Sequence, residues 1–395
     1  MSRLAATART LGELIAFPTV SAESNRALIA MMAHRLEDAG ARIRLIASAD
    51  GTKANLLASF GAEAPGGVVL SGHSDVVPAE ETGWSGDPFL MRDSGGRLYG
   101  RGACDMKGFL ACVLETLPDL ARATRPVHIA VTYDEEVGCL GGRQLVETMR
   151  AEGLRPRLAL IGEPTSMRIV EGHKGCCEYS TRFHGLEGHG SQPDRGVSAV
   201  EYAARFAMRL LELRADLRDR CPAGSAFDPP HTTLQIGRIE GGVAHNVIAG
   251  LAQVDWELRP VAWADRDFAL GAARAYCDEV LLPAMRAVHP EAAVEMLTVG
   301  EVPGLEPVPE NEARAVIAAL TGANGAELVS FGTEAGLFQS LGCDAVVCGP
   351  GDIAQAHKAD EYVDCGQLQA CLDLLEGIAR RQAGDGVFMK EKTGP

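Results

Sequence analysis

The stretch VTYDEEVGCLGG, residues 131–142, carries the chain from a predicted buried strand, through three consecutive carboxylates, into a predicted helix. The apolar run that leads into it is typical of a strand covered on both faces. Asp134, Glu135 and Glu136 follow where this strand ends, and carboxylates held side by side repel one another and raise one another's pKa. A solvated acidic turn is the ordinary explanation of such a triplet. A site that uses the charges is the alternative.

Strand and helix patterns alternate around this stretch. Short apolar segments at 66–72 and 157–164 are typical of buried strands, and residues 106–123 have the periodicity of an amphipathic helix. Such alternation predicts an α/β fold with a mostly parallel sheet flanked by helices. We expect residues 1–173 and 303–395 to form this larger domain together.

The pattern changes between Lys174 and Val302. Two long amphipathic helices, over 196–217 and 268–288, are separated by strands in the order βαββαβ, which is typical of a ferredoxin-like fold. Residues 174–302 are therefore predicted to form an α+β domain that is inserted into the larger one. The end of the chain, 387–395, is predicted to be a frayed tail.

Length, net charge and cysteine content limit the classes of function that this chain can have. A chain of 395 residues is too long for one ordinary core, which agrees with two domains. Its formal net charge of −16 disfavours nucleic acids and anionic membranes as partners and suits a protein that holds cations. No apolar run is long enough to span a bilayer, and the first residues do not resemble a secretory signal. Eleven cysteines without an export signal indicate reduced thiols, so we expect a cytoplasmic protein.

Further polar residues lie where strands of the larger domain are predicted to end. His73 and Asp75 follow one strand, and Glu163 ends another. Asp105 directly precedes a helix, and His357 lies in a loop near the C-terminus. A lone histidine or glutamate at such a place is usually just solvated. In open α/β sheets, however, ligand sites gather beyond the carboxyl ends of the strands, so several clusters there favour a shared site.

Two divalent cations close together would account for this collection of carboxylates and imidazoles, which are ligand types that suit zinc and neighbouring metals. Anions that repel one another in water are stabilised beside two dications. Glu135 would remain as an unligated base, and Asp75 would fix the tautomer of the His73 imidazole. In this hypothesis Asp105 bridges the two ions, with His73 and Glu163 on one and Glu136 and His357 on the other.

Five segments resemble, in order, the motifs of the dinuclear zinc amidohydrolases, a family that includes aminoacylases, carboxypeptidase G-type enzymes, succinyl-diaminopimelate desuccinylases and acetylornithine deacetylases. The resemblance covers essentially the whole chain. It implies two divalent metal ions, zinc with cobalt as a possible substitute, and the same ligands and base as above. The segments are GHSDVVP (72–78), GRGACDMKG (100–108), YDEEVGCLGG (133–142), GEPT (162–165) and AHKADEYV (356–363).

The segment SFGTEAGLFQS, 330–340, looks most like the acetylornithine deacetylase branch. The resemblance implies that Glu334 faces the cationic end of an ornithine side chain; a stabilising acid at a helix N-terminus is the alternative role. The implied activity is hydrolysis of the amide of an N-acyl amino acid, with N2-acetylornithine first. Desuccinylation, another N-acyl amino acid such as acetylcitrulline, and a metal-binding homologue without catalysis remain open.

The inserted domain would contribute to the site by the same resemblance. In relatives, a histidine at the position of His189 stabilises the oxyanion from the partner subunit, which implies a homodimer formed through the inserted domain. Asn246 and Arg259 would approach polar groups of the substrate, and the Arg259 guanidinium would suit a carboxylate. A solvated loop histidine and an arginine in a surface salt bridge are the alternatives for His189 and Arg259.

Overall fold

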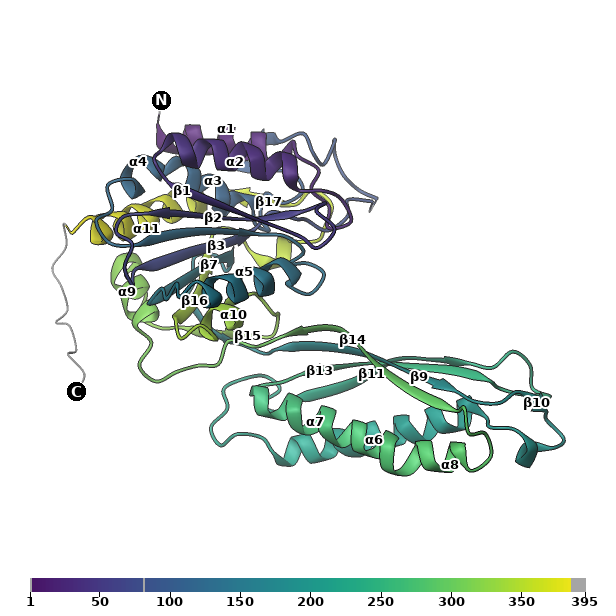
Figure 1. Ribbon diagram of the computed structural model, residues 1–395. Helices are drawn as coiled ribbons and strands as arrows, with labels where there is room; N and C mark the ends of the chain where they lie inside the picture. The colour runs from purple at the N-terminus through teal and green to yellow at the C-terminus, as the bar shows by residue number, and fades with distance from the viewer. Residues whose placement is uncertain (1, 81, 385–395) are drawn as a thin grey trace. The chain divides into compact units, whose positions relative to one another are not determined.

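The computed structural model describes residues 2–80 and 82–384, which form two compact units (Figure 1). The first unit contains the chain up to Gly172, Pro307–Glu327 and the residues from Thr333 onward. The second unit contains His173–Glu306 and Leu328–Gly332. The predicted tail, 387–395, lies outside the described residues.

The boundary of the insertion differs from the predicted range of 174–302. The second unit continues to Glu306 because the backbone N–H of His173 donates to the carbonyl of Leu305 at 3.0 Å, which keeps the two ends of the insertion paired. A short piece of the C-terminal part of the chain, Leu328–Gly332, also belongs to the second unit. The spacing of apolar residues along the sequence cannot predict that this later segment belongs to the second unit.

The first unit is built on one eight-stranded sheet with helices on both faces (Figure 1). The helices α1 (Arg3–Ile15), α3 (Lys107–Glu115) and α11 (Cys365–Ala383) lie on one face, and α5 (Leu140–Ala151) and α10 (Ala335–Gln339) lie on the other. The strands, in their order across the sheet, are β1 (Arg42–Ala47), β2 (Ala54–Phe60), β6 (Val127–Thr132), β3 (Val68–His73), β7 (Leu158–Pro164), β16 (Asp344–Gly349), β8 (Val170–His173) and β15 (Glu327–Val329). The helices of this unit are α1 (Arg3–Ile15), α2 (Arg26–Asp38), α3 (Lys107–Glu115), α4 (Leu117–Leu120), α5 (Leu140–Ala151), α9 (Glu312–Thr321), α10 (Ala335–Gln339) and α11 (Cys365–Ala383).

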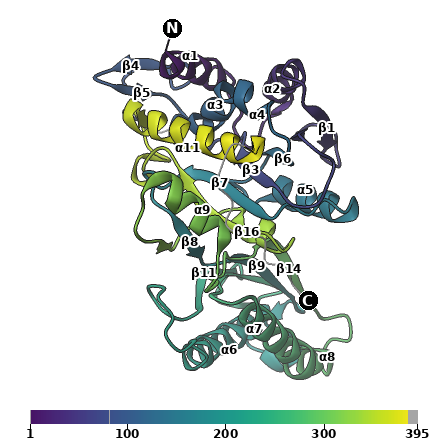
Figure 2. The same ribbon diagram turned by 90° about the vertical axis from the view of Figure 1, so that its left-hand side faces the viewer.

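Four central strands, β6, β3, β7 and β16, run parallel to one another, so their carboxyl ends meet at one edge of the sheet. The predicted parallel sheet is therefore present at the centre, but β1 and β2 add to it in antiparallel fashion. The sequence did not predict β1, because it is an edge strand whose residues are largely exposed. It did not predict β2 either, although this strand is buried over nearly its whole length. Figure 2 shows α11 crossing the unit beside α9.

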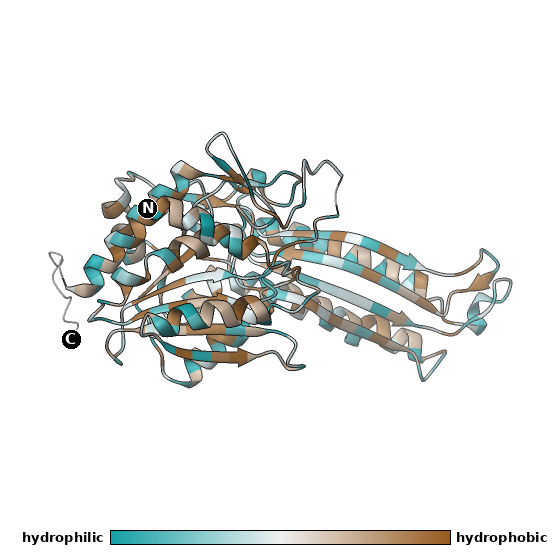
Figure 3. Cartoon of the chain, turned by 90° about the horizontal axis from the view of Figure 1, so that it is seen from above, coloured by the Kyte–Doolittle hydropathy of each residue, from teal (hydrophilic) through white to brown (hydrophobic). Residues whose placement is uncertain are grey.

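The second unit has the predicted βαββαβ order. Its four main strands, β9 (Cys176–His184), β11 (Thr233–Gly241), β13 (Leu251–Arg259) and β14 (Ala293–Val302), form an antiparallel sheet in the order β11-β13-β9-β14. The helices α6 (Ala199–Asp219) and α7 (Trp263–Tyr276) cover one face of this sheet (Figure 2). Hydrophilic and hydrophobic residues alternate along the strands, as expected when one face is covered (Figure 3).

Two predicted helices are broken where prolines occur. The helix expected over 106–123 divides at Thr116, because Pro118 lies in the first turn of the short helix α4, which begins at Leu117. The helix expected over 268–288 contains a π-helical segment, Cys277–Leu281, before Pro283 in the first turn of α8 (Leu282–Arg286). No helix in the described part of the chain is long and apolar enough to cross a membrane.

Candidate metal centre

The first group of candidate ligands lies at the carboxyl ends of two neighbouring parallel strands. His73 is the last residue of β3, and Glu163 lies near the end of β7. Asp105 reaches them from the loop before α3. The Nε2 atom of His73 lies 2.9 Å from Oδ1 of Asp105 and 3.6 Å from Oε1 of Glu163. All three side chains are buried, so the structure brings these predicted ligands together.

The second group shares Asp105 with the first. The Nε2 atom of His357 lies 3.5 Å from Oδ2 of Asp105 and 3.1 Å from Oε2 of Glu136. The two oxygens of Asp105 therefore face different groups, Oδ1 toward His73 and Oδ2 toward His357. The predicted bridging position of Asp105 corresponds to this arrangement. In each group the three ligand atoms lie within 4.8 Å of one another.

The electrostatics of the two groups fit cations. Burial, and then the charge of Asp105, raise the pKa of Glu163 well above its usual range. Burial would lower the pKa of His73, but the carboxylates of Glu163 and Asp105 raise it well above its usual value. Hydrogen bonding to Asp105 and Glu136 raises the pKa of His357 to about 10. In the two groups together, carboxylates outnumber imidazoles, and most of these side chains are buried. Divalent cations would remove the resulting excess of negative charge.

One atom is a direct test of this fit. The Oε1 atom of Glu163 is buried without a hydrogen-bond partner among the described residues, which is costly for a carboxylate oxygen. Imidazole nitrogens and carboxylate oxygens are also the donors that zinc and similar metals take in proteins. The residues present therefore fit two divalent ions.

The carboxylate of Asp75 contacts the acidic segment rather than the imidazole. The Nδ1 atom of His73 faces the backbone carbonyl of Asp75 at 2.9 Å, whereas the nearer carboxylate oxygen lies at 3.6 Å. That carboxylate accepts hydrogen bonds from the backbone N–H groups of Glu135, at 3.2 Å, and Glu136, at 3.4 Å, and from the hydroxyl of Ser21, at 2.7 Å. The expectation that the Asp75 side chain fixes the His73 tautomer is corrected: the main chain of Asp75 does so.

The three carboxylates of the opening segment have three different environments. Asp134 pairs with the Lys53 ammonium at 2.5 Å and so belongs to neither ligand group. Glu136 faces His357. Glu135 belongs to neither group either, and the Cys139 thiol contacts its Oε1 at 3.5 Å. Burial and the neighbouring charge of Glu136 raise the pKa of Glu135 well above its usual range, which suits a general base.

Glu334 contradicts the expectation that it faces a substrate side chain. It is only 1% exposed, and the hydroxyl of Ser71 donates to its Oε1 at 2.6 Å. Its Oε2 lies against Gly142, where a Cβ atom would approach to 2.6 Å. The carboxylate is thus in the interior of the first unit, between β3 and the start of α5. Glu334 is the N-cap residue of α10, which is the position of the alternative role, although its side chain makes no capping hydrogen bond.

The structure brings together two of the three candidate residues of the second unit. His189, in β10 (Gly188–His189), pairs with β12 (Val247–Ile248), and the backbone N–H of Gly190 donates to the carbonyl of Asn246 at 2.8 Å. Arg259 lies instead at the far end of β13. Its guanidinium pairs with Glu257 through contacts of 2.7 and 3.1 Å, which is the salt bridge weighed as the alternative.

Four further residues around the centre were not predicted. Ser21 and Lys53 contact Asp75 and Asp134, but they are distant in the sequence and no pattern connects them. Arg101 and Glu361 form a buried ion pair, and both belong to segments already quoted for their motifs. The positions of Arg101 and Glu361 inside those motifs were the sequence signal that could have identified them.

Comparison with known proteins agrees with this geometry. A family model described as peptidase family M20/M25/M40 matches residues 69–381. The chain is 37% identical over 376 residues to the acetylornithine deacetylase of Shigella sonnei (strain Ss046), which covers 92% of this chain and 94% of that protein.

Solved structures with low sequence identity have the same fold. An M20-family metallo-carboxypeptidase from Sulfolobus solfataricus matches with a TM-score of 0.71 and 17% identity, over 95% of this chain and 99% of that chain. A dinuclear metal-binding peptidase of the M20 family from Bacillus subtilis matches with a TM-score of 0.62 and 16% identity, over 97% and 98%. Because the family model spans most of the sequence and the curated relative spans nearly all of it, the chain belongs to peptidase family M20/M25/M40.

Proposed function

We propose that this chain is a metal-dependent amidohydrolase that removes an acyl group from the α-nitrogen of an amino acid, with N2-acetylornithine as its substrate. The observation that carries the proposal is the pair of ligand groups sharing Asp105, with Glu135 beside them and outside both. Similarity to an acetylornithine deacetylase along nearly the full length of both chains supports the choice of substrate.

The proposed cofactor is a pair of divalent ions, zinc in the first place and cobalt as a substitute. His73, Asp105 and Glu163 would hold one ion, and Asp105, Glu136 and His357 the other. Such ions supply Lewis-acid polarisation of a carbonyl and lower the pKa of water.

Glu135 is the residue proposed to move the proton. Its carboxylate takes a proton from the attacking water and delivers it to the departing α-nitrogen. Burial raises the pKa of the Glu135 carboxyl above its usual range, which favours its acting as a proton acceptor and then as a proton donor. The two backbone N–H groups that donate to Asp75 fix the segment on which this base lies. A silent metal-binding homologue would have no use for such a base.

His189 is proposed to donate to the developing oxyanion. The backbone N–H of Ser191 donates to its Nδ1 at 3.2 Å, so the proton of the neutral ring lies on Nε2. An exposed donor of this kind would stabilise negative charge on the acyl oxygen. Asn246, adjacent to His189, and Arg259 are proposed to bind the polar groups of the substrate.

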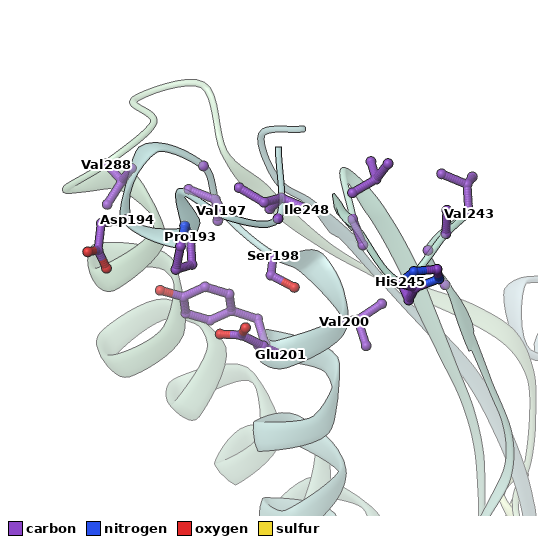
Figure 4. Close-up of a pocket in the computed structure, with 18 residues that line it drawn as sticks. Pro193, Asp194, Val197, Ser198, Val200, Glu201, Val243, His245, Ile248 and Val288 are labelled. Carbon is purple, nitrogen blue, oxygen red and sulfur yellow. The ribbon is translucent and has the colours of Figure 1, made fainter. Parts of the chain in front are cut away.

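The second unit is proposed to form a homodimer. Its strand β11 lies at the edge of the sheet, with Ile239 53% exposed and Val243 82% exposed nearby. Unpaired edge strands with apolar side chains are ready to pair with another chain. A hollow of about 720 Å³, drawn in Figure 4, lies beside this edge; Val200, Val243 and Ile248 line it together with His245. We place the enzyme in the cytoplasm, where its cysteines would stay as thiols.

A substrate panel tests the function. Purified, zinc-loaded protein would be assayed with N2-acetylornithine, N2-acetylcitrulline, N-acetylmethionine and N-succinyl-diaminopimelate, and amine release would be followed. The proposal expects the highest kcat/KM with N2-acetylornithine. A higher kcat/KM with the succinylated substrate would assign the chain to desuccinylation, and no turnover of any of them by metal-loaded protein would reject the amidohydrolase itself.

A further inference from the structure

Two charged residues of the quoted motifs have no role in the chemistry described so far. Arg101 lies in the segment that carries Asp105, and Glu361 lies in the segment that carries His357. The two form an ion pair between Nη1 and Oε2 at 2.9 Å, and each side chain is only 1% exposed. A buried ion pair is rarely kept for stability alone, because removing two charges from water costs more than their attraction usually returns.

The carboxylate of Glu361 is bonded to the backbone that leads into Asp105. Its Oε2 accepts from the N–H of Gly102 at 3.0 Å, in addition to the guanidinium. Its Oε1 accepts from the N–H groups of Cys104, at 2.9 Å, and Asp105, at 3.1 Å. One buried carboxylate therefore accepts from four donors, three of which are backbone N–H groups of the chain segment that ends at Asp105.

Arg101 extends the same connection to one more loop and to the residue that follows His357. Its Nη2 donates to the carbonyl of Pro78 at 2.9 Å, in the segment that follows Asp75. Its Nη1 also lies 3.4 Å from the carbonyl of Lys358, the residue after His357. The carbonyl of Glu361 accepts in turn from the N–H of Gly100 at 2.9 Å. The pair thus joins the loops that present Asp105 and His357.

The geometry of the two ligand groups depends on the Arg101–Glu361 pair to different extents. His73 and Glu163 belong to the adjacent strands β3 and β7, whose hydrogen bonds fix their separation. His357 lies in a loop, its side chain is 51% exposed, and its backbone has a φ of 59°, a value that non-glycine residues seldom adopt. The sheet does not hold His357, so its distance from Asp105 depends on contacts within the loops.

We propose that Glu361 is a positioning residue that sets the separation of Asp105 and His357 and thereby the affinity of the second metal position, formed by Asp105, Glu136 and His357. Arg101 supports it by fixing the carboxylate and the flanking loops. The inference rests on the proposed two-metal function and adds to it a residue that touches neither the ions nor the substrate.

The variant Glu361→Gln tests the inference. The carboxamide keeps one acceptor oxygen, but its NH₂ group would face donors that now have no acceptor, so the segment before Asp105 should shift. Loss of a residue that orients metal ligands typically costs about 10- to 100-fold in metal affinity. We expect that loss at the second position and a smaller one at the first, which shares Asp105 but has its other two residues on adjacent strands. Titration of metal-free protein with Co²⁺, followed by visible absorption and by calorimetry, measures both constants without any assay of activity.

The matched control is Glu376→Gln. Glu376 lies on α11 in the same unit and pairs with Arg3, but its side chain is 34% exposed. This variant should bind two Co²⁺ ions with the constants of the unsubstituted protein. Glu361→Asp is a second test variant, since it keeps the charge while its shorter arm cannot serve the guanidinium and the Asp105 segment together.

The outcomes separate the inference from the proposed function. If the unsubstituted protein binds fewer than two ions, the two-metal function itself is wrong. If the unsubstituted protein binds two ions and both Glu361 variants bind two ions with the same constants as the unsubstituted protein, only the positioning role is wrong. Circular dichroism of each variant, with and without saturating Zn²⁺, completes the test: variants that stay unfolded with metal would show that Glu361 supports the whole unit, which also overturns the positioning role.

Discussion

The backbone N–H of Glu135 donates to Oδ1 of Asp75 at 3.2 Å, so the candidate base and the residue two positions beyond the His73 ligand are connected directly. Strands β6 and β3 are neighbours in the sheet, and this bond joins the loops that follow them. The base is therefore positioned by main-chain geometry, while its own carboxylate stays available.

Asp75→Asn should weaken the connection between residue 75 and the segment that carries Glu135. The carboxamide can accept from one of the two N–H groups that Asp75 now serves, so the segment carrying Glu135 loses part of its support. We expect kcat to fall by about 10- to 100-fold, with KM and metal content nearly unchanged. Steady-state kinetics with elemental analysis of the same preparation checks this. Loss of metal in proportion to activity would instead assign Asp75 to metal binding.

Glu135→Gln and Glu136→Gln should have different effects although the residues are adjacent. Removing a general base typically costs about 10²- to 10⁴-fold in rate, so Glu135→Gln should lower kcat by that factor and retain both metal ions. Glu136→Gln should weaken binding at the second position, because this carboxylate faces His357. Metal titration and turnover are measured for both variants, and equal behaviour of the two would reject the division of roles.

Removal of metal should abolish activity and also lower the thermal stability of the protein. Buried carboxylates such as Glu163 would then repel one another without a counter-ion. Dialysis against a chelator should give an inactive protein with a lower Tm, and two equivalents of zinc or cobalt per chain should restore both properties. An active preparation without detectable metal would contradict the mechanism.

His189 should act across the proposed dimer. A His189→Ala chain and a Glu135→Gln chain are each expected to be nearly inactive, but a mixed dimer would carry one site with both groups intact. Co-expression with two different tags allows the mixed dimer to be isolated and assayed. Activity approaching half that of the unsubstituted dimer is expected. An inactive mixed dimer would confine His189 to the site of its own chain.

Acid should destabilise the first unit through His128. This side chain is 5% exposed, lies 2.8 Å from the Ser59 hydroxyl, and burial lowers its pKa from the usual 6.5 to about 4. Between these values the unfolded chain binds a proton that the folded chain refuses, so stability is complete above about pH 6.5 and decreases as the pH falls toward 4. At about 1.4 kcal/mol per pKa unit, the contribution lost at pH 5 is about 2 kcal/mol.

His128→Gln should therefore flatten the dependence of the unfolding free energy on pH. Urea unfolding of metal-free protein at pH 7.5 and pH 5 measures it. His34→Gln, at a side chain that is 76% exposed on α2, is the control and should leave the slope unchanged. An unaltered slope in His128→Gln would mean that another group accounts for acid unfolding.

The sequence predicted, for a physical reason, which polar side chains would come together. Parallel strands bring their carboxyl ends to one edge, so polar residues at the ends of separate strands converge without any knowledge of side-chain packing. His73 and Glu163 follow this rule, whereas Asp105 reaches them from the loop before α3. Their assignment to two groups also required His357, which lies on no central strand and was inferred from its motif.

Glu334 was misinterpreted for the opposite reason. Its run of neighbours identifies a short helix after a loop, but whether the carboxylate points outward or inward depends on Ser71, a residue far away in the sequence. The carboxylate of Asp75 was assigned to the wrong partner in the same way, because its main-chain donors come from another strand end. Periodicity describes an element, while such contacts depend on how elements are packed together.

The position of β16 between β7 and β8 has a consequence for the order in which the protein is made. On the ribosome, His73, Asp105 and Glu163 emerge before the second unit is synthesised, whereas β16, His357 and Glu361 emerge after it. The nascent chain thus carries all three residues proposed to hold one cation before it carries those proposed for the second, and the place between β7 and β8 stays open until β16 has been made.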